Sequence, residues 1–270
     1  RNDSLIAAIG KAEHGGSFDF PDWCAPLFDL FDELFSATSG AIDPCVGEDL
    51  IRLGYDASLS FTVTQDAPEH LGALRGRAVW GRDVTRHGTT LVTHEPVQLD
   101  FGACGKGYLV DLLGRMLQSS QFVIDAGGDL LIHAEQPISV ALEDPEDQSH
   151  AIGIAHIANG ALCASAPSRR HWNVAVNERT QIAIHHLLNA IDGLPAQQTE
   201  ASWAYIPANA TLNLARDYPT AVADGLATAL FVSDVAQLQR TFDFTYATLD
   251  ESRQIAVSRN FPAELFLRSA

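Results

Sequence analysis

Hydrophobic residues recur at helical spacing in the segment that follows Pro26. They form an i, i+3, i+4, i+7, i+8 stripe: Leu27, Leu30, Phe31, Leu34 and Phe35. Gly40, a residue type that often ends a helix, follows the stripe. The pattern therefore predicts an amphipathic helix between Pro26 and Gly40.

The same spacing predicts further helices later in the chain. One follows the glycines at 105 and 107, with one apolar face made of Leu109, Leu112, Leu113, Met116 and Leu117. Another runs from about Pro219 to Val232, and a shorter one covers Val235–Phe242.

Short apolar runs predict strands in most of the remaining chain. Residues 71–99 alternate between polar or glycine positions and apolar ones, as in hairpins that feed the run Thr90–Leu99. Later runs of this kind are Gln121–Asp125, Asp129–His133, Ile138–Glu143, Ala151–Ile157, Ala161–Ala164, Gln181–Ile184, Phe244–Leu249 and Gln254–Val257. Because strands and helices do not alternate strictly, the order favours an α+β fold.

The stretch Ala196–Tyr218 is the least periodic part of the chain, and it predicts a long loop or an insertion. The length of 270 residues suits one large domain or two packed halves, and we expect a single domain over residues 1–270. No apolar run comes near the roughly 18 residues that a membrane span needs, so no transmembrane segment is expected.

The charge balance excludes some classes of partner. The chain has 17 Lys and Arg against 34 Asp and Glu, a net charge of −17. Such a surface repels phosphate backbones and anionic lipids, so nucleic acid is not an expected partner. Only two of the cations are lysines, Lys11 and Lys106.

Lys106 lies in a glycine-rich segment that leaves a predicted strand and enters a predicted helix. Glycines at 102, 105 and 107 allow a ligand to approach the backbone, and a helix N-terminus favours an anion. Gly107 stands where a P-loop needs Ser or Thr, so the segment is not a P-loop. A tight turn with a solvated lysine is the alternative interpretation.

Asp224 and Thr228 are four residues apart on the helix predicted from Pro219, so their side chains share one face. A carboxylate and a hydroxyl one turn apart form half of a site that Mg²⁺ accepts. Such pairs also occur on ordinary solvent-facing helices.

Two adjacent histidines, His185 and His186, follow the strand predicted at Gln181–Ile184, and Asp192–Gly193 forms a turn beyond them. Neighbouring residues of a strand face opposite sides, so at most one of the two serves a given site. A hydrogen-bonded structural histidine is the alternative for either one.

Taken together and in order, five segments resemble signatures of the ApbE family, the FAD:protein FMN transferases. They are Ser39–Gly47 (SGAIDPCVG), Leu99–Asp111 (LDFGACGKGYLVD), Asp125–Asp129 (DAGGD), His186–Pro195 (HLLNAIDGLP) and Ala223–Val232 (ADGLATALFV). The resemblance implies an α+β fold with internally duplicated antiparallel sheets and packed helices, related to the T-fold.

The resemblance also implies an activity. Such an enzyme uses Mg²⁺ to transfer FMN from its substrate FAD to a threonine hydroxyl of an acceptor protein and releases AMP. The resemblance also implies a location on the periplasmic side of the cell envelope, where members of the family usually work. The sequence itself leaves the compartment undetermined.

Site residues follow from the resemblance position by position. Asp224 and Thr228 would hold Mg²⁺ together with the Ala103 carbonyl. FAD would contact the backbone of Ala41, Ile42 and Asp43, as well as Asp100, Lys106 and His186. His186 and Asp224 would be the catalytic residues, with His186 as the general base. Physical chemistry agrees in one respect, because a diphosphate needs local positive charge to bind so acidic a protein.

The chain departs from the family on the acceptor side. Asn189, Ala190 and Asp192 stand where Asp, Pro and Thr are usual. We also expect the family's N-terminal strand and helix to be largely missing. Two alternatives therefore stay open: an FAD pyrophosphatase that releases FMN and AMP, and a non-catalytic FAD-binding protein of the same fold.

Overall fold

The computed structural model describes residues 4–117, 121–177 and 180–266. The chain divides into two compact units, each made of two sequence segments. The first unit comprises residues 1–101 and 170–196, and the second comprises residues 102–169 and 197–270. The single domain over residues 1–270 stays a prediction, and residues 1–3, 118–120, 178–179 and 267–270 of it lie outside the described residues.

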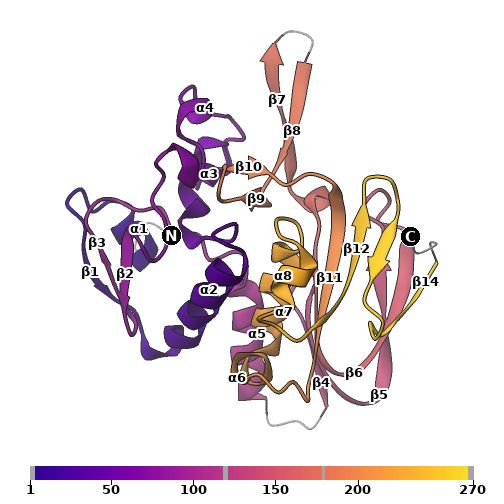
Figure 1. Ribbon diagram of the computed structural model, residues 1–270. Coiled ribbons are helices and arrows are strands. Elements are labelled where there is room, and N and C mark those ends of the chain that lie inside the picture. Colours follow the sequence, from indigo (N-terminus) through magenta and orange to yellow (C-terminus); the bar gives the residue numbers. More distant parts are fainter. Residues whose placement is uncertain (1–3, 118–120, 178–179, 267–270) are drawn as a thin grey trace. The chain divides into compact units, whose positions relative to one another are not determined.

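The first unit combines short helices with small antiparallel sheets (Figure 1). Its helices are α1 (Leu5–Ile9), α2 (Ala25–Ala37), α3 (Gly47–Arg52) and α4 (Ala67–His70), with 3-10 turns η1 (Asp22–Cys24), η2 (Pro44–Val46) and η3 (Ala73–Arg75). One sheet has the order β1-β3-β2, from β1 (Gly16–Asp19), β3 (Thr90–Thr93) and β2 (Val84–His87). Two further pairs are β7 (His171–Asn177) with β8 (Thr180–His185), and β9 (Leu188–Asn189) with β10 (Leu194–Pro195).

Helix α2 confirms the helix predicted after Pro26. Its apolar stripe is buried except for Phe35, which is half-buried. The rings of Phe28 and Phe31 both pack against that of Phe101, at centroid distances of 5.7 and 5.3 Å. Gly40 follows with φ +89°, and its N–H donates to the Phe35 carbonyl at 2.8 Å. The glycine therefore closes the helix in the left-handed conformation that its position in the sequence suggested.

The hairpin prediction for residues 71–99 is confirmed only at β2 and β3. The segment before them turns instead of extending, because Gly72 and Gly76 adopt positive φ angles of 78° and 91°. The run predicted as Thr90–Leu99 ends as a strand at Thr93. Pro96, which lacks a backbone N–H for a sheet ladder, follows three residues later.

The second unit contains a large antiparallel sheet with the order β13-β12-β11-β6-β5-β4, and β14 also pairs with β6 (Figure 1). The strands are β4 (Phe122–Asp125), β5 (Asp129–Glu143), β6 (Ala151–Ser165), β11 (Thr199–Pro207), β12 (Thr245–Asp250), β13 (Ile255–Val257) and β14 (Ala263–Leu265). The helices are α5 (Gly105–Met116), α6 (Asn213–Asp217), α7 (Pro219–Ala229) and α8 (Val235–Leu238), with a 3-10 turn η4 at Pro167–Arg169. Helix α8 is shorter than the predicted Val235–Phe242, whereas the closing hairpin β12–β13 is confirmed.

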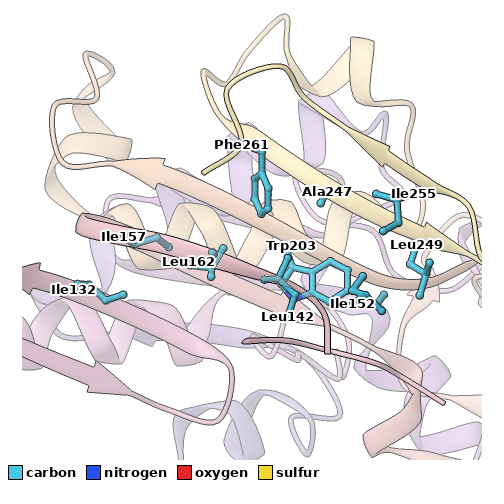
Figure 2. Close-up of a cluster of buried hydrophobic side chains, with 12 residues drawn as sticks. Ile132, Leu142, Ile152, Ile157, Leu162, Trp203, Ala247, Leu249, Ile255 and Phe261 are labelled. Carbon is cyan, nitrogen blue, oxygen red and sulfur yellow. The ribbon is translucent and has the colours of Figure 1, made fainter. Parts of the chain in front are cut away.

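The two faces of this sheet have different partners. Helix α7 packs on β6 and β11, and the Ser202 hydroxyl donates to the Ala227 carbonyl across that contact. The other face carries a buried apolar cluster that includes Leu142, Ile152, Trp203 and Leu249 (Figure 2). An antiparallel sheet with helices packed on one face is the predicted α+β arrangement.

The loop predicted at Ala196–Tyr218 is wrong for most of that stretch, which contains β11 and α6. Strand β11 lies between β6 and β12, with Ala201 and Trp203 in the apolar cluster and Ser202 against α7. Because both of its faces are buried, its sequence shows no alternation between polar and apolar residues. Strand β11 was not recognised in the sequence because residues that face α7, such as Ser202, are small.

No helix in the described ranges has the length and apolar character to cross a membrane.

Candidate functional site

Helices α5 and α7 of the second unit pack closely together at Gly107. A Cβ atom added there would lie 2.3 Å from the Thr220 carbonyl oxygen and 2.9 Å from the Asp224 Cβ, so a side chain does not fit. The Gly107 N–H donates to Asp224 Oδ2 at 3.0 Å. The glycine therefore places the buried Asp224 carboxylate at the N-terminal turn of α5, where unpaired N–H groups favour an anion.

The Lys106 ammonium bridges two buried carboxylates. Its Nζ lies 2.9 and 3.1 Å from Asp224 Oδ1 and Oδ2, and 2.8 Å from Asp129 Oδ2. Both aspartate side chains are 2% exposed, whereas the lysine side chain is 53% exposed. Two carboxylates thus share one ammonium, and with both carboxylates ionised the group carries a net negative charge.

Asp129 is a residue that the sequence analysis did not assign to the site. It begins β5 directly after Gly127 and Gly128, which both have positive φ. The Gly127 N–H and the Gly128 N–H both donate to Asp125 Oδ1, and this turn delivers Asp129 to Lys106. The acidic residue after the Gly-Gly turn was visible in the sequence and is the feature that could have identified it.

The pKa values at this group follow from burial and charge. Burial, followed by the charge of Asp129, raises the pKa of Asp224, while Lys106 and the Gly107 N–H act against that rise. Burial alone lowers the pKa of Lys106, but the charges of Asp224 and Asp129 outweigh it, so the pKa of Lys106 is raised. A buried carboxyl whose charged form is disfavoured gains from a second cation nearby.

Asp224, Thr228 and Ala103 carry oxygen donors of a kind that suits Mg²⁺. Asp224 and Thr228 lie one turn apart on α7, and Ala103 lies two residues before the first residue of α5. A carboxylate, a hydroxyl and a carbonyl are oxygen donors of the kind that Mg²⁺ prefers, and the net negative charge also fits a divalent cation. Among the described residues no group of three or more His, Cys, Asp or Glu is arranged to hold a metal. A metal at Asp224 would therefore depend on these other oxygens and on those of a ligand.

The predicted FAD-contacting residues Ala41, Ile42 and Asp43 lie in the first unit and are buried. The Ala41 carbonyl accepts the Ala190 N–H at 3.0 Å, and the Ile42 N–H donates to Thr38 Oγ1, also at 3.0 Å. These backbone groups hold the segment within its own unit. The FAD contact stays a prediction.

The Asp43 carboxylate belongs to a buried ion network that the sequence did not reveal. Arg77, with no side-chain exposure, lies 2.8 Å from Asp49 Oδ2 and 3.4 Å from Asp43 Oδ2. Its Nη2 also donates to the Ala190 carbonyl at 2.7 Å. Arg77 therefore ties together three segments of the first unit that are far apart in the sequence.

Asp100 is half-buried at the end of the first unit, and its N–H donates to the Pro44 carbonyl at 2.7 Å. This bond joins the segment Leu99–Asp111 to the segment Ser39–Gly47, close to Asp43. Two predicted FAD contacts, Asp43 and Asp100, are therefore neighbours within one unit.

The two histidines have different roles in the first unit. His185 uses both ring nitrogens, because Nε2 donates to the Ala196 carbonyl at 2.8 Å and Nδ1 accepts the Leu187 N–H at 3.2 Å. Burial lowers its pKa, against the opposing effect of the Ala196 bond. His185 is thus a neutral structural residue.

His186 Nδ1 lies 3.3 Å from the Arg170 carbonyl. Since a carbonyl only accepts, Nδ1 carries the hydrogen and the neutral ring has its lone pair on Nε2. The ring also lies 6.3 Å from that of Tyr55. This tautomer is the one that a base acting through Nε2 requires.

The predicted site residues therefore fall into two groups, each described within its own unit. The second unit brings Lys106 and Asp224 into direct contact and carries Thr228 on the same helix as Asp224. The first unit holds Ala41–Asp43, Asp100 and His186.

The comparisons with known proteins agree on one relationship. A family model described as the ApbE family matches residues 1–248. No curated protein sequence gives a significant match. Similar solved structures include an ApbE protein from Thermotoga maritima, with a TM-score of 0.75 and 19% identity over 97% of this chain and 84% of that one.

Two further structures are the flavin transferase ApbE from Vibrio cholerae and the flavinyl transferase ApbE from Pseudomonas stutzeri. The first has a TM-score of 0.73 and 18% identity over 97% of this chain and 82% of that one. The second has a TM-score of 0.68 and 18% identity over 96% and 80%. At these identities the likeness shows a common fold, and it confirms the predicted α+β, ApbE-like fold class.

Proposed function

The chain belongs to the ApbE family, and we propose that it is a flavin transferase that moves FMN from FAD to a threonine hydroxyl of an acceptor protein, with Mg²⁺, and releases AMP. The named activity of the Vibrio cholerae and Pseudomonas stutzeri proteins of this fold supports flavin transfer. The buried Asp224 carboxylate, held by Lys106 and Gly107 with Thr228 one turn away, is the observation that carries the rest.

Asp224, Thr228 and the Ala103 carbonyl are the groups proposed to hold Mg²⁺. Bound there, Mg²⁺ would supply positive charge toward the pyrophosphate of FAD, which the net charge of −17 otherwise repels. Lys106 adds a positive charge that the neighbouring carboxylates keep fully ionised. The charge of Lys106 would stabilise the negative charge that moves onto the departing AMP, and bound Mg²⁺ would add to this effect.

The transfer itself makes one bond and breaks one. The threonine oxygen attacks the phosphorus of the FMN half, a P–O bond forms, and the bond from that phosphorus to the bridging oxygen breaks. AMP leaves with the bridging oxygen and its electron pair. His186 is the proposed base for the hydroxyl proton, because the Arg170 carbonyl fixes its hydrogen on Nδ1, so that Nε2 carries the lone pair of the neutral ring.

The remaining FAD contacts are assigned by resemblance. Asp100 and the backbone of Ala41–Asp43 are proposed to contact the flavin nucleotide. The Asp43 side chain is not assigned to the ligand, because its oxygens accept from Arg77 and from the N–H groups of Cys45 and Trp80.

One experiment separates this activity from its alternatives. The protein is incubated with FAD and Mg²⁺, with and without a threonine-bearing acceptor peptide, and AMP, FMN and peptide mass are followed. We expect AMP together with a flavin-labelled peptide. AMP with free FMN in both samples identifies a pyrophosphatase instead, and tight FAD binding without AMP identifies a non-catalytic binding protein.

The D224N variant tests the assignment of Asp224 as a Mg²⁺ ligand. We expect it to abolish the Mg²⁺-dependent release of AMP. Full turnover in D224N contradicts Asp224 as a metal ligand.

A further inference from the structure

Lys106 binds the Asp224 carboxylate, which is also the group that the proposed function assigns to a metal ion. Its ammonium lies within hydrogen-bond distance of both Asp224 oxygens and of Asp129 Oδ2. Asp224 Oδ2 also accepts the Gly107 N–H. A metal ion that coordinates Asp224 must therefore share or replace the contact with Lys106.

Asp129 gives that ammonium a second place to bind. It is as buried as Asp224, with 2% side-chain exposure, and it comes from β5 and not from either helix. Its contact with Lys106 does not involve Asp224. If Lys106 leaves Asp224, the ammonium keeps Asp129 as an oppositely charged partner, so the exchange does not leave an unpaired cation next to buried groups.

Resting on the proposed function, which makes Asp224 a metal ligand, we infer that Lys106 is an internal cation that satisfies Asp224 in the metal-free protein and is displaced onto Asp129 when metal binds. Asp129 is then a positioning residue. It retains Lys106 next to the metal, where its charge faces the same anionic substrate. Lysine suits this exchange because its ammonium is a compact charge at the end of a flexible, half-exposed stem.

Competition between Lys106 and metal has a thermodynamic consequence. Two cations that compete for one carboxylate cannot both contribute their full stabilisation, so removal of one increases the effect of the other. A metal ion that binds away from this carboxylate leaves the contribution of Lys106 unchanged. The melting temperature with and without metal therefore separates exchange from a merely structural ion pair.

The first test is thermal unfolding of the wild type, K106M and K11M, each in EDTA and in saturating Mg²⁺. K11M is the matched control, because Lys11 is the other lysine of the chain and is exposed in the first unit. We expect K106M to melt lower than the wild type in EDTA and to gain more from Mg²⁺ than the wild type or K11M gains. Equal Mg²⁺ shifts in all three overturn the exchange. K106Q gives the same comparison if K106M does not fold.

The second test is Mn²⁺ binding, followed by the EPR signal of the free ion. We expect K106M to bind Mn²⁺ about tenfold more tightly or more, the range that the loss of one competing charged hydrogen bond gives. D129N should weaken binding when Lys106 is present and have a smaller effect in the K106M background. An equal effect in both backgrounds shows that Asp129 acts only through its charge and overturns its role in holding Lys106.

D224N separates failure of this inference from failure of the proposed function. If D224N and the wild type bind Mn²⁺ equally, Asp224 is not a metal ligand and the metal part of the proposed function fails with the exchange. If D224N abolishes binding but K106M leaves it unchanged, only the exchange fails.

Discussion

The Asp111 carboxylate on α5 lies 2.8 Å from the backbone nitrogen of Ala221, the third residue of α7. Its other oxygen accepts the Thr220 N–H at 3.1 Å. Tyr218, which precedes α7, provides no side-chain cap of its own. Asp111 therefore caps α7 from a different helix and fixes the turn that leads to Asp224.

D111N should destabilise the protein by about 1–3 kcal/mol, because an amide has one acceptor oxygen where two buried N–H groups need partners. We expect this loss in the free energy of unfolding measured by urea denaturation. D217N serves as control, because Asp217 is half-exposed and pairs with the neighbouring Arg216. Equal stability of D111N and D217N contradicts the cap.

The same residue predicts a pH dependence. Burial raises the pKa of Asp111 to about 6, although hydrogen bonds from Thr220 and the Ala221 N–H lower it. A carboxyl with a raised native pKa contributes stability below its unfolded value near 4, and this contribution is lost as pH rises through about 6.

The stability difference between the wild type and D111N should therefore shrink by about 1 kcal/mol between pH 5 and pH 7, since D111N has no proton to lose. Urea denaturation of both proteins at the two pH values measures it. A difference that grows with pH contradicts the raised pKa of Asp111.

Gly107 sets the distance between α5 and α7. In G107A the new Cβ meets the Thr220 carbonyl oxygen at 2.3 Å, and backbone cannot move aside cheaply. We expect a loss of at least about 1 kcal/mol in the free energy of unfolding, together with weaker Mn²⁺ binding at Asp224. Gly114 on the same helix is the matched control.

In G114A the nearest atom to the new Cβ is the Leu131 Cδ2, the end of a flexible side chain. Alanine also favours a helix over glycine by about 1 kcal/mol, so G114A should be close to wild type. If G107A and G114A lose equal stability, the contact with Thr220 does not set the distance between α5 and α7.

The sequence predicted elements whose pattern is local. Helix α2 was visible because only one of its faces is apolar, and Asp224 and Thr228 were visible because one helical turn joins them. Strand β11 was missed because both of its faces are buried. The local pattern of polar and apolar residues does not show which element packs against the second face of a strand.

The partners of the site residues were harder to predict because they come from distant parts of the chain. Asp129 reaches Lys106 from another element, and Arg77 reaches Asp43 across the first unit. Neither contact has a characteristic spacing. For His185 and His186, the strand period predicted that at most one of the pair serves a given site, and hydrogen bonds identify His185 as a structural residue.

Substitution of Arg77 should cause a larger loss of stability than the other substitutions. R77M removes the only charge that both Asp43 and Asp49 contact within the described part of the chain, and each of these side chains is at most 1% exposed. An unpaired buried charge typically costs about 3–5 kcal/mol, and we expect a loss of this size in urea denaturation. R82M is the control, because Arg82 is 60% exposed. A loss as small as in R82M contradicts a compensating role for Arg77.

His186 and His185 should respond differently to substitution. H186A removes the proposed base, so we expect the rate of flavin transfer to fall by roughly 10²–10⁴-fold. FAD binding, followed by flavin fluorescence, should change much less. H185A breaks the bonds with Ala196 and Leu187 instead, so it should lower the melting temperature.

The role of His186 follows from comparing how much H186A loses in FAD binding and how much it loses in the rate of flavin transfer. A base acts on the hydroxyl proton and is not needed to hold FAD, so only the transfer rate should show the full effect. Equal losses of transfer and FAD binding in H186A indicate a binding residue. H185A should keep its transfer rate per folded molecule at temperatures well below its melting point, because both ring nitrogens are hydrogen-bonded within the fold.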